Sequence, residues 1–412
     1  MMEVTVKNTK LNGRINAITS KSYAQRALFL SLLAKGTSKI TIKDWSYDIK
    51  NSLGIIVDLG CKVVKEEDVI FITPPEVFPQ SVNINAGESG TALRFIIPIL
   101  AVLGIKSRIK REGSLIKRTN KVIFDLLKEH GIKIWENKEF IFIDGKLKNG
   151  TFEILGNISS QFISGLLIAL GSLEDGSKII IKERLESRPY VNMTIDLLKK
   201  FNADIAEDKN FFTVRGPLCA IQYEVETDWS NALFFIVTGC EVIGLNKQSI
   251  QGDRKALDYL YEMGFKNISP ENFKLVKDNT KIEQIVIDAS DIPDTIPILS
   301  VISAISVKKT LIKNIKRLRL KESDRVKTTT EMLVNMGVNV RVFEDSFEIT
   351  GVDEFKSCTV NSYNDHRIVM SSSIAALFCD NYIKILNAQA VKKSYVGFFE
   401  DFKMLGGEYI VK

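Results

Sequence analysis

Six segments of the chain are apolar at nearly every position. They occupy residues 27–36, 92–104, 162–171, 233–240, 296–306 and 368–378. A helix that is apolar on all sides is stable only where protein covers all of it. The pattern therefore predicts six buried helices. The longest apolar helix, at 93–103, is interrupted by Arg94 and Pro98 and is too short to cross a bilayer.

A second set of six segments has one apolar and one polar face, and each ends in a glycine or asparagine before a strand-like run. The segments are 55–63, 124–134, 195–205, 257–267, 330–340 and 400–410. Their turn residues, 62 to 73 positions apart, are Gly60, Gly131, Asn202, Gly264, Gly337 and Gly406. These two residue types tolerate the left-handed backbone that closes a helix. The spacing predicts six successive units, each with a buried helix, a half-exposed helix and strands.

This pattern predicts an α/β (α+β) fold in which buried helices lie inside and sheets lie around them. A chain of 412 residues is too long for one ordinary hydrophobic core, so we expect two domains.

The composition, 45% apolar and 26% charged, is that of an ordinary soluble protein. The net charge of +6 suits a small polyanionic substrate and is too diffuse for a nucleic-acid-binding surface. Five scattered cysteines form no CxxC pair, and two histidines cannot build a His-rich metal site. We therefore expect a cytoplasmic protein without disulfides or metal. The N-terminal residues have no signal-peptide core.

Polar and basic residues stand where several of the predicted buried helices begin, and there free N–H groups and the helix dipole favour anions. Others lie in a basic loop at 111–120 or just before a half-exposed helix. In the first half of the chain the candidates are Lys21, Ser22, Arg26, Gly90, Thr91, Arg118, Ser159, Ser160, Gln161, Ser187 and Tyr190. Ser22 and Arg26 share a helix face, while Gly90 lets a backbone approach a ligand closely. Taken singly, each could equally be a helix cap, a tight turn or a solvated charge run.

The second half of the chain repeats this arrangement. Its candidates are Asp294, Lys321, Glu322, Arg325, His366, Arg367 and Lys393. Asp365 can cap a helix, but His366 and Arg367 would then oppose the helix dipole, which an anion bound nearby would relieve. The chain has no Walker A loop, GxGxxG motif or Ser/His/Asp signature. Together these features indicate a substrate with several negative charges, bound without metal, nucleotide or other cofactor.

The motifs identify a family. SKSYAQRA, SGTALR, SSQF, SRPY, DIPD, LKESDR and YNDHR occur in the order found in the enolpyruvyl transferases that act on shikimate 3-phosphate. The chain resembles that family, the EPSP synthases, over essentially its whole length. The resemblance implies transfer of the enolpyruvyl group of phosphoenolpyruvate to the 5-hydroxyl of shikimate 3-phosphate, in the pathway to chorismate and the aromatic amino acids.

The resemblance also implies a two-domain inside-out α/β barrel of six βαβαββ-type repeats. Residues 14–228 would form one domain, and 1–13 with 229–412 the other, joined by two chain crossings that act as a hinge. We expect a monomer that binds neither nucleic acid nor membrane.

Site roles follow from the resemblance, residue by residue. Shikimate 3-phosphate would contact Lys21, Ser22, Arg26, Ser159, Ser160, Gln161, Ser187, Tyr190, Asp294 and Lys321. Phosphoenolpyruvate would contact Lys21, Gly90, Thr91, Arg118, Gln161, Arg325, His366, Arg367 and Lys393. Asp294, Glu322 and Lys21 would handle the protons. Family members with glycine at position 90 are sensitive to glyphosate, and Gly90→Ala should weaken inhibition more than it weakens donor binding.

Two positions depart from the family pattern, and two alternatives stay open. Arg317 and its neighbours replace an Asn–Trp–Arg run of one branch, so a substrate contact from that asparagine is not carried over. Lys392 could replace Lys393 after a one-residue shift, although the spacing favours Lys393. UDP-N-acetylglucosamine 1-carboxyvinyltransferases share the donor, but they usually carry a mobile-loop cysteine that REGSLIKR lacks. A non-catalytic anion- or RNA-binding module would not need Asp294 and Glu322 beside cations.

Overall fold

The computed structural model describes residues 2–278 and 280–412. The chain divides into two compact units. We call Thr19–Glu226 the N-terminal unit, and Met1–Ile18 with Thr227–Lys412 the C-terminal unit. The sequence analysis placed residues 14–18 and 227–228 in the other unit. They belong to the C-terminal unit because the strand at 14–16 pairs with Glu241–Ile243 and the side chain of Asp228 caps a helix there.

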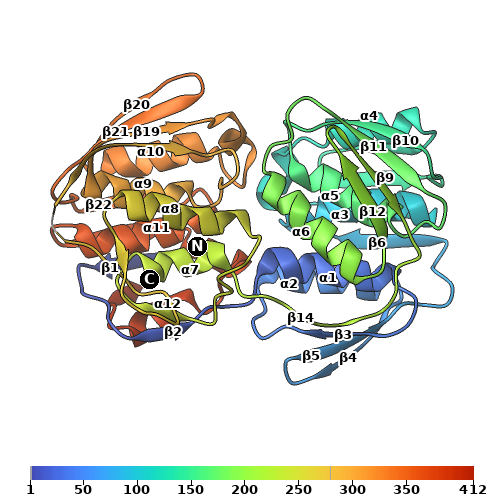
Figure 1. The fold of residues 1–412 in the computed structure, drawn as a ribbon, viewed down its shortest axis with the longest axis horizontal. Helices are drawn as coiled ribbons and strands as arrows, with labels where there is room; N and C mark the ends of the chain where they lie inside the picture. Colours follow the sequence, from blue (N-terminus) through green and yellow to red (C-terminus); the bar gives the residue numbers. More distant parts are fainter. Residues whose placement is uncertain (1, 279) are drawn as a thin grey trace. The chain divides into compact units, whose positions relative to one another are not determined.

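The N-terminal unit contains three four-stranded sheets of one topology (Figure 1). The first repeat comprises α1 (Lys21–Leu33), β3 (Ser38–Thr41), α2 (Tyr47–Asp58), β4 (Lys62–Glu66), β5 (Val69–Thr73) and β14 (Gln222–Glu224). The second comprises β6 (Ser81–Asn85), α3 (Gly90–Leu103), β7 (Lys106–Lys110), η1 (Gly113–Lys117), α4 (Lys121–Glu129), β8 (Lys133–Glu136) and β9 (Phe140–Asp144). The third comprises β10 (Thr151–Leu155), α5 (Ser160–Leu170), β11 (Ser177–Lys182), α6 (Arg188–Lys200), β12 (Asp204–Asp208) and β13 (Phe211–Arg215).

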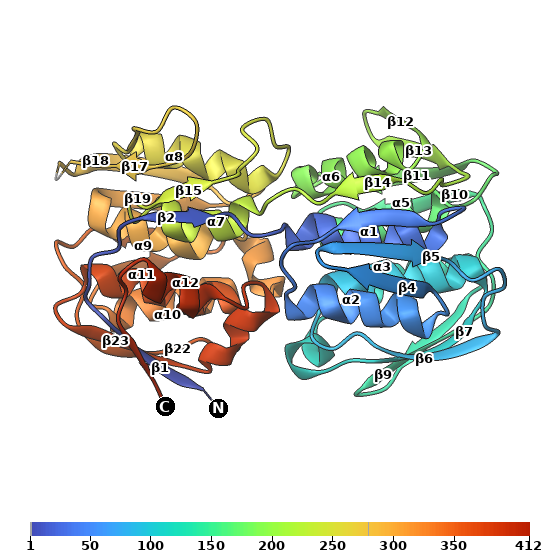
Figure 2. The same ribbon diagram turned by 90° about the horizontal axis from the view of Figure 1, so that it is seen from below.

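The C-terminal unit has the same repeats with one sheet in two pieces (Figure 2). That repeat comprises β2 (Arg14–Asn16), α7 (Trp229–Ile236), β15 (Glu241–Ile243), η2 (Gly252–Lys255), α8 (Ala256–Glu262), β16 (Lys266–Asn267) and β17 (Leu275–Val276). The next comprises β18 (Ile282–Asp288), α9 (Ile296–Ser306), β19 (Val307–Lys313), η3 (Lys316–Leu320), α10 (Arg325–Asn335), β20 (Asn339–Val342) and β21 (Ser346–Thr350). The last comprises β22 (Cys358–Asn361), α11 (His366–Ala375), η4 (Ala376–Phe378), β23 (Tyr382–Leu386), η5 (Ala388–Lys393), α12 (Phe398–Met404), β24 (Tyr409–Val411) and β1 (Glu3–Lys7).

Each repeat is a βαβαββ unit, as the repeat β6-α3-β7-α4-β8-β9 illustrates. Its first two strands are parallel and are joined through the inner helix, and its last two form an antiparallel hairpin. Three repeats take one strand from a distant part of the chain: β14 pairs with β3, β2 with β15, and β1 with both β23 and β24. Backbone groups in a strand must be paired wherever water is excluded, and these distant segments supply the partners.

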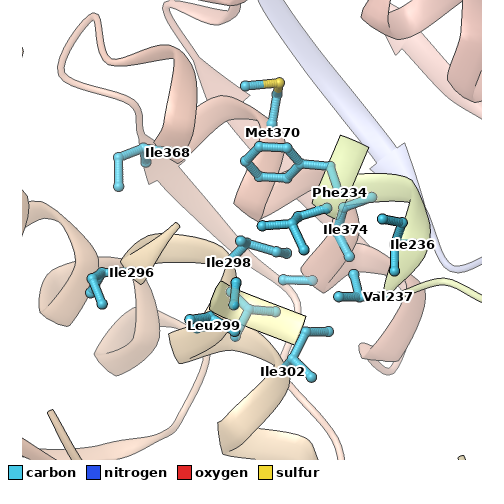
Figure 3. Packing of buried hydrophobic residues seen from close by; sticks show 14 of the residues in the cluster. Phe234, Ile236, Val237, Ile296, Ile298, Leu299, Ile302, Ile368, Met370 and Ile374 are labelled. Carbon is cyan, nitrogen blue, oxygen red and sulfur yellow. The ribbon is translucent and has the colours of Figure 1, made fainter. Parts of the chain in front are cut away.

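The inner helices are buried as predicted. Almost every residue of α3, α5 and α9 is inaccessible to water, and each unit has its own core. Figure 3 shows such packing in the C-terminal unit, where α7, α9 and α11 contribute Phe234, Ile298 and Met370. In both ribbon views the sheets lie outside these helices. Within the described residues, no helix combines the length and the apolar character needed to cross a membrane.

The six predicted helix-ending turns are also confirmed. Every one of these residues has positive φ, from +68° at Asn202 to +99° at Gly406. The left-handed turn lets the chain leave each outer helix and enter the next strand with its terminal carbonyls bonded.

Two helical glycines give opposite expectations for stability. A Cβ at Gly54 in α2 meets nothing within 4 Å, whereas one at Gly165 in α5 would overlap the backbone carbonyl oxygen of Arg94 in α3. We expect Gly54→Ala to stabilise the protein by up to about 1 kcal/mol through helix propensity. Gly165→Ala should destabilise it by roughly 1–3 kcal/mol, because α3 and α5 must move apart. Urea denaturation measures the free energy of unfolding of both variants. Equal changes in that free energy would contradict the packing of α3 against α5.

Candidate active site

A lysine at the N-terminus of α1 is fixed by an ion pair with α2. Ser20 caps the helix by accepting from the N–H of Tyr23, and Lys21 is the first helical residue. The Lys21 ammonium lies 3.0 Å from a carboxylate oxygen of Asp48 in α2, and both side chains are largely buried. This pair fixes the Lys21 ammonium at the end of a buried helix. Ser22 follows it in the first turn.

Arg26, one turn further along, connects α1 to α6. Its guanidinium donates to the Thr194 hydroxyl at 2.8 Å, the Ser22 carbonyl at 2.7 Å and the Tyr190 carbonyl at 2.9 Å. Burial lowers the pKa of Arg26 to about 10, which leaves it charged at neutral pH. Arg26 thus places Ser22 and Tyr190 together. Ser187, the N-cap residue of α6, has left-handed backbone and a buried side chain.

The heads of α3 and α5 are joined by side chains. Gln161 donates through Nε2 to the Thr91 hydroxyl at 2.8 Å and accepts at Oε1 from Arg94 at 2.6 Å. Ser159 caps α5, and its hydroxyl oxygen also accepts from Arg94 at 3.3 Å. Ser160 is the first residue of that helix and is buried.

Arg118 lies against Gly90, the first residue of α3. A Cβ built on Gly90 would be 2.5 Å from Arg118 Nη1 and 2.9 Å from its Cζ. A side chain at position 90 would therefore force this guanidinium to shift away from the helix end. The sequence analysis assigned Gly90 to close approach of a ligand, and the structure shows close approach of Arg118.

In the C-terminal unit, Arg325 is surrounded by carboxylates. Its guanidinium is fully buried and lies 2.7 Å from Asp294, 2.7 Å from Glu322 and 2.9 Å from Asp365. Burial alone would lower the pKa of Arg325, but the three carboxylates outweigh it and raise that pKa well above its usual value. The ion pairs connect the N-terminal ends of α9, α10 and α11.

Asp294 is the centre of this cluster. One of its oxygens also accepts from Lys321 at 3.2 Å, and the other lies 3.6 Å from Arg367. Burial lowers the pKa of Lys321, opposed by the charge of Asp294. Thr295, not Asp294, is the N-cap residue of α9, so Asp294 contacts cations rather than capping the helix.

The remaining predicted residues adjoin the head of α11. His366 and Arg367 begin the helix and are buried, and Arg367 donates to the Asn231 amide oxygen at 3.3 Å. Lys393 donates to the Asn364 carbonyl at 2.8 Å. Lys393 is buried beside the YNDHR turn, whereas Lys392 is only half-buried.

Sequence reasoning missed several residues of these clusters, among them Asp48, Arg94, Asp365 and Asp253. Arg94 had a visible signal, since it is the one charged residue inside an apolar helix. Asp365 was expected only as a cap, and its ion pair with Arg325 depends on the packing of α10 against α11. Asp253 is buried and contacts the Ser230 hydroxyl, and burial together with the charge of Asp294 raises its pKa to about 7. Nothing near Asp253 in the sequence indicates this.

Each unit therefore gathers cations and hydroxyl or amide donors at helix N-termini, which is an arrangement for anions. The C-terminal cluster adds carboxylates that can accept or return protons.

Known proteins resemble this chain over nearly its whole length. A family model described as EPSP synthase (3-phosphoshikimate 1-carboxyvinyltransferase) matches residues 6–402. The 3-phosphoshikimate 1-carboxyvinyltransferase of Brachyspira hyodysenteriae is 38% identical over 99% of this chain and 100% of its own length. That of Clostridioides difficile is 37% identical over 99% and 98% of the two chains.

Solved structures have the same fold. EPSP synthase from Acinetobacter baumannii superimposes with a TM-score of 0.80 at 23% identity, over 100% of both chains. The enolpyruvyl transferase NikO from Streptomyces tendae gives 0.78 at 13% identity, over 100% and 99% of the two chains. With the family model and curated relatives covering nearly all of its length, the chain belongs to the EPSP synthase (3-phosphoshikimate 1-carboxyvinyltransferase) family.

Proposed function

We propose that the protein transfers the enolpyruvyl group of phosphoenolpyruvate to the 5-hydroxyl of shikimate 3-phosphate and releases phosphate. Family membership supports this activity. The observation that links this activity to named residues is the pair of clusters described above. Seven ordered family motifs supply most of their polar side chains, which lie at or beside helix N-termini.

The acceptor substrate contacts hydroxyl and amide donors together with a few cations. Its residues in the N-terminal unit are Lys21, Ser22, Arg26, Ser159, Ser160, Gln161, Ser187 and Tyr190. In the C-terminal unit they are Asp294 and Lys321. The Arg26 guanidinium donates three hydrogen bonds to protein groups, so its role is partly to position Ser22 and Tyr190.

Phosphoenolpyruvate contacts mainly cations. Its residues are Lys21, Gly90, Thr91, Arg118, Gln161, Arg325, His366, Arg367 and Lys393. Guanidinium groups suit the phosphate and the carboxylate because they can donate two parallel hydrogen bonds to each. They also stabilise the charge that builds up on the departing phosphate.

The chemistry is an addition followed by an elimination. The 5-hydroxyl oxygen bonds to C2 of phosphoenolpyruvate as its proton leaves, and C3 gains a proton and becomes a methyl group. The tetrahedral intermediate then loses phosphate from C2 and a proton from C3, which restores the double bond. Asp294, with Lys321 and Arg367 on its two oxygens, accepts the hydroxyl proton. Glu322 and Lys21 exchange the remaining protons. These are the proton that C3 gains and then loses, and the proton that accompanies the departing phosphate.

We further infer that the protein acts as a monomer in the cytoplasm. Its five cysteines are free thiols, which suits a reducing compartment, and one chain supplies both clusters. Analytical ultracentrifugation with and without substrates tests the oligomeric state.

The activity itself is tested by phosphate release from the two substrates together. We expect release with shikimate 3-phosphate as acceptor and none with UDP-N-acetylglucosamine. Asp294→Asn should fold normally and lose turnover by roughly 10²–10⁴-fold, the usual worth of a general acid or base. Asp291→Asn, in the same segment, is the matched control and should keep the parental rate. If Asp294→Asn stays within a few-fold of the parent, the base lies elsewhere.

Gly90→Ala tests the contact with Arg118. The added methyl group would displace the guanidinium, so the KM for phosphoenolpyruvate should rise about 10-fold, as for loss of a charge-assisted hydrogen bond. Inhibition by glyphosate should weaken by a larger factor, since the longer inhibitor is crowded too. Steady-state kinetics measure both constants, with Gly54→Ala as the control. A KM unchanged from the parent would show that Arg118 does not depend on Gly90.

A further inference from the structure

We propose that Arg94 is a positioning residue that makes Ser159 and Gln161 meet the substrate as hydrogen-bond donors only. The inference rests on the proposed function and deepens it. No motif of the family resemblance assigned Arg94 a role at the site.

Arg94 reaches the head of α5 from α3. It lies one turn after Gly90, in a helix whose other inward residues are apolar, and 4% of its surface is exposed. Its Nη1 is 2.6 Å from Gln161 Oε1 and 3.3 Å from Ser159 Oγ. Burying a guanidinium costs desolvation free energy, and these hydrogen bonds offset part of that cost.

The contacts occupy both acceptor sites of Ser159 and turn the Gln161 amide oxygen toward Arg94. The Ser159 hydroxyl oxygen has two lone pairs, and it accepts from Arg94 and from the N–H of Gln161 at 3.3 Å. Only its proton remains, and no described group accepts it. The Gln161 carbonyl oxygen accepts the short bond from Arg94, and one of its two amide protons goes to Thr91. The second amide proton remains.

An ionised phosphate or carboxylate only accepts hydrogen bonds. Without Arg94 the Gln161 amide could rotate by half a turn and present its oxygen, and the Ser159 lone pairs could face the ligand. Both changes would repel an anion. Arg94 fixes the opposite orientation by electrostatics, since neither amide protons nor a hydroxyl proton can point at a guanidinium.

A second contact of Arg94 provides a separate structural role that can be tested independently. Its Cζ lies 4.7 Å from the ring centroid of Phe162, and this cation–π contact helps hold α3 against α5. Phe162→Leu removes the ring face and leaves both hydrogen bonds in place. A purely structural Arg94 and a positioning Arg94 therefore give different results in a matched pair of variants.

The test compares Arg94→Met with Phe162→Leu. Both should lower the melting temperature. Arg94→Met should also lower kcat/KM for shikimate 3-phosphate by roughly 10–100-fold, as expected for hydrogen bonds to a charged group. Phe162→Leu should keep kcat/KM within about threefold of the parent. Equal kinetic losses in the two variants, or no loss in Arg94→Met, would overturn the proposal.

A double-mutant cycle shows whether Arg94 acts through its two partners. In a Ser159→Ala, Gln161→Ala background, Arg94→Met should change kcat/KM by less than about threefold, because the residues act as one unit. Full additivity would overturn the proposal.

A variant that leaves Arg94 intact covers the case in which Arg94→Met does not fold. Gln161→Glu keeps an acceptor for Arg94 but has no amide proton, so calorimetry should show at least about 10-fold weaker binding of shikimate 3-phosphate. Parental affinity would contradict the inference. If the parent releases no phosphate from the two substrates, the proposed function fails. Calorimetry with inorganic phosphate then still measures whether Gln161→Glu weakens anion binding.

Discussion

A helix that is buried along its whole length can satisfy its first four N–H groups only at its end, and the rest of this structure follows from that constraint. Each inner helix is enclosed by protein, so its polar requirements concentrate at the N-terminus. Side-chain oxygens cap five of them, at Ser20, Ser89, Ser159, Asp228 and Asp365. The remaining free N–H groups and the helix dipole make these ends positive, and polar side chains gather there.

The two units meet this constraint with different chemistry. In the N-terminal unit, neutral donors such as Ser159 and Gln161 predominate, and Arg94 orients both of them. In the C-terminal unit, cations are balanced by carboxylates, and Arg325 alone contacts three. A buried charge without a partner is too costly, so these carboxylates are needed to keep Arg325 buried. This explains why acids and cations alternate in the LKESDR and YNDHR motifs.

The repeated βαβαββ topology determines which helix ends lie together in each cluster. Because the βαβαββ units among the described residues share one topology, apart from the unit whose sheet is in two pieces, the inner helices start at the same end of their sheets. Side chains far apart in sequence therefore meet within a unit, as Arg94 meets Gln161 and Arg325 meets Asp365. Glycine is required where α5 comes closest to α3, at Gly165 beside the backbone of Arg94, and at Gly90 it leaves room for the Arg118 guanidinium.

The sequence by itself determined the inner helices, the outer helices and the turn at each repeat, because these depend on local patterns of apolar residues and on backbone preferences near Gly60 or Asn202. It also indicated the polar helix heads, since serine, glycine and basic residues there interrupt apolar runs. Only the tertiary structure decided which strands complete three of the sheets and which partners Arg94, Asp253 and Asp365 contact. Strand pairing and ion pairing join residues up to hundreds of positions apart, as β1 joins β23. No local pattern encodes such a pairing, because its energy depends on burial and distance, which exist only once the chain has folded.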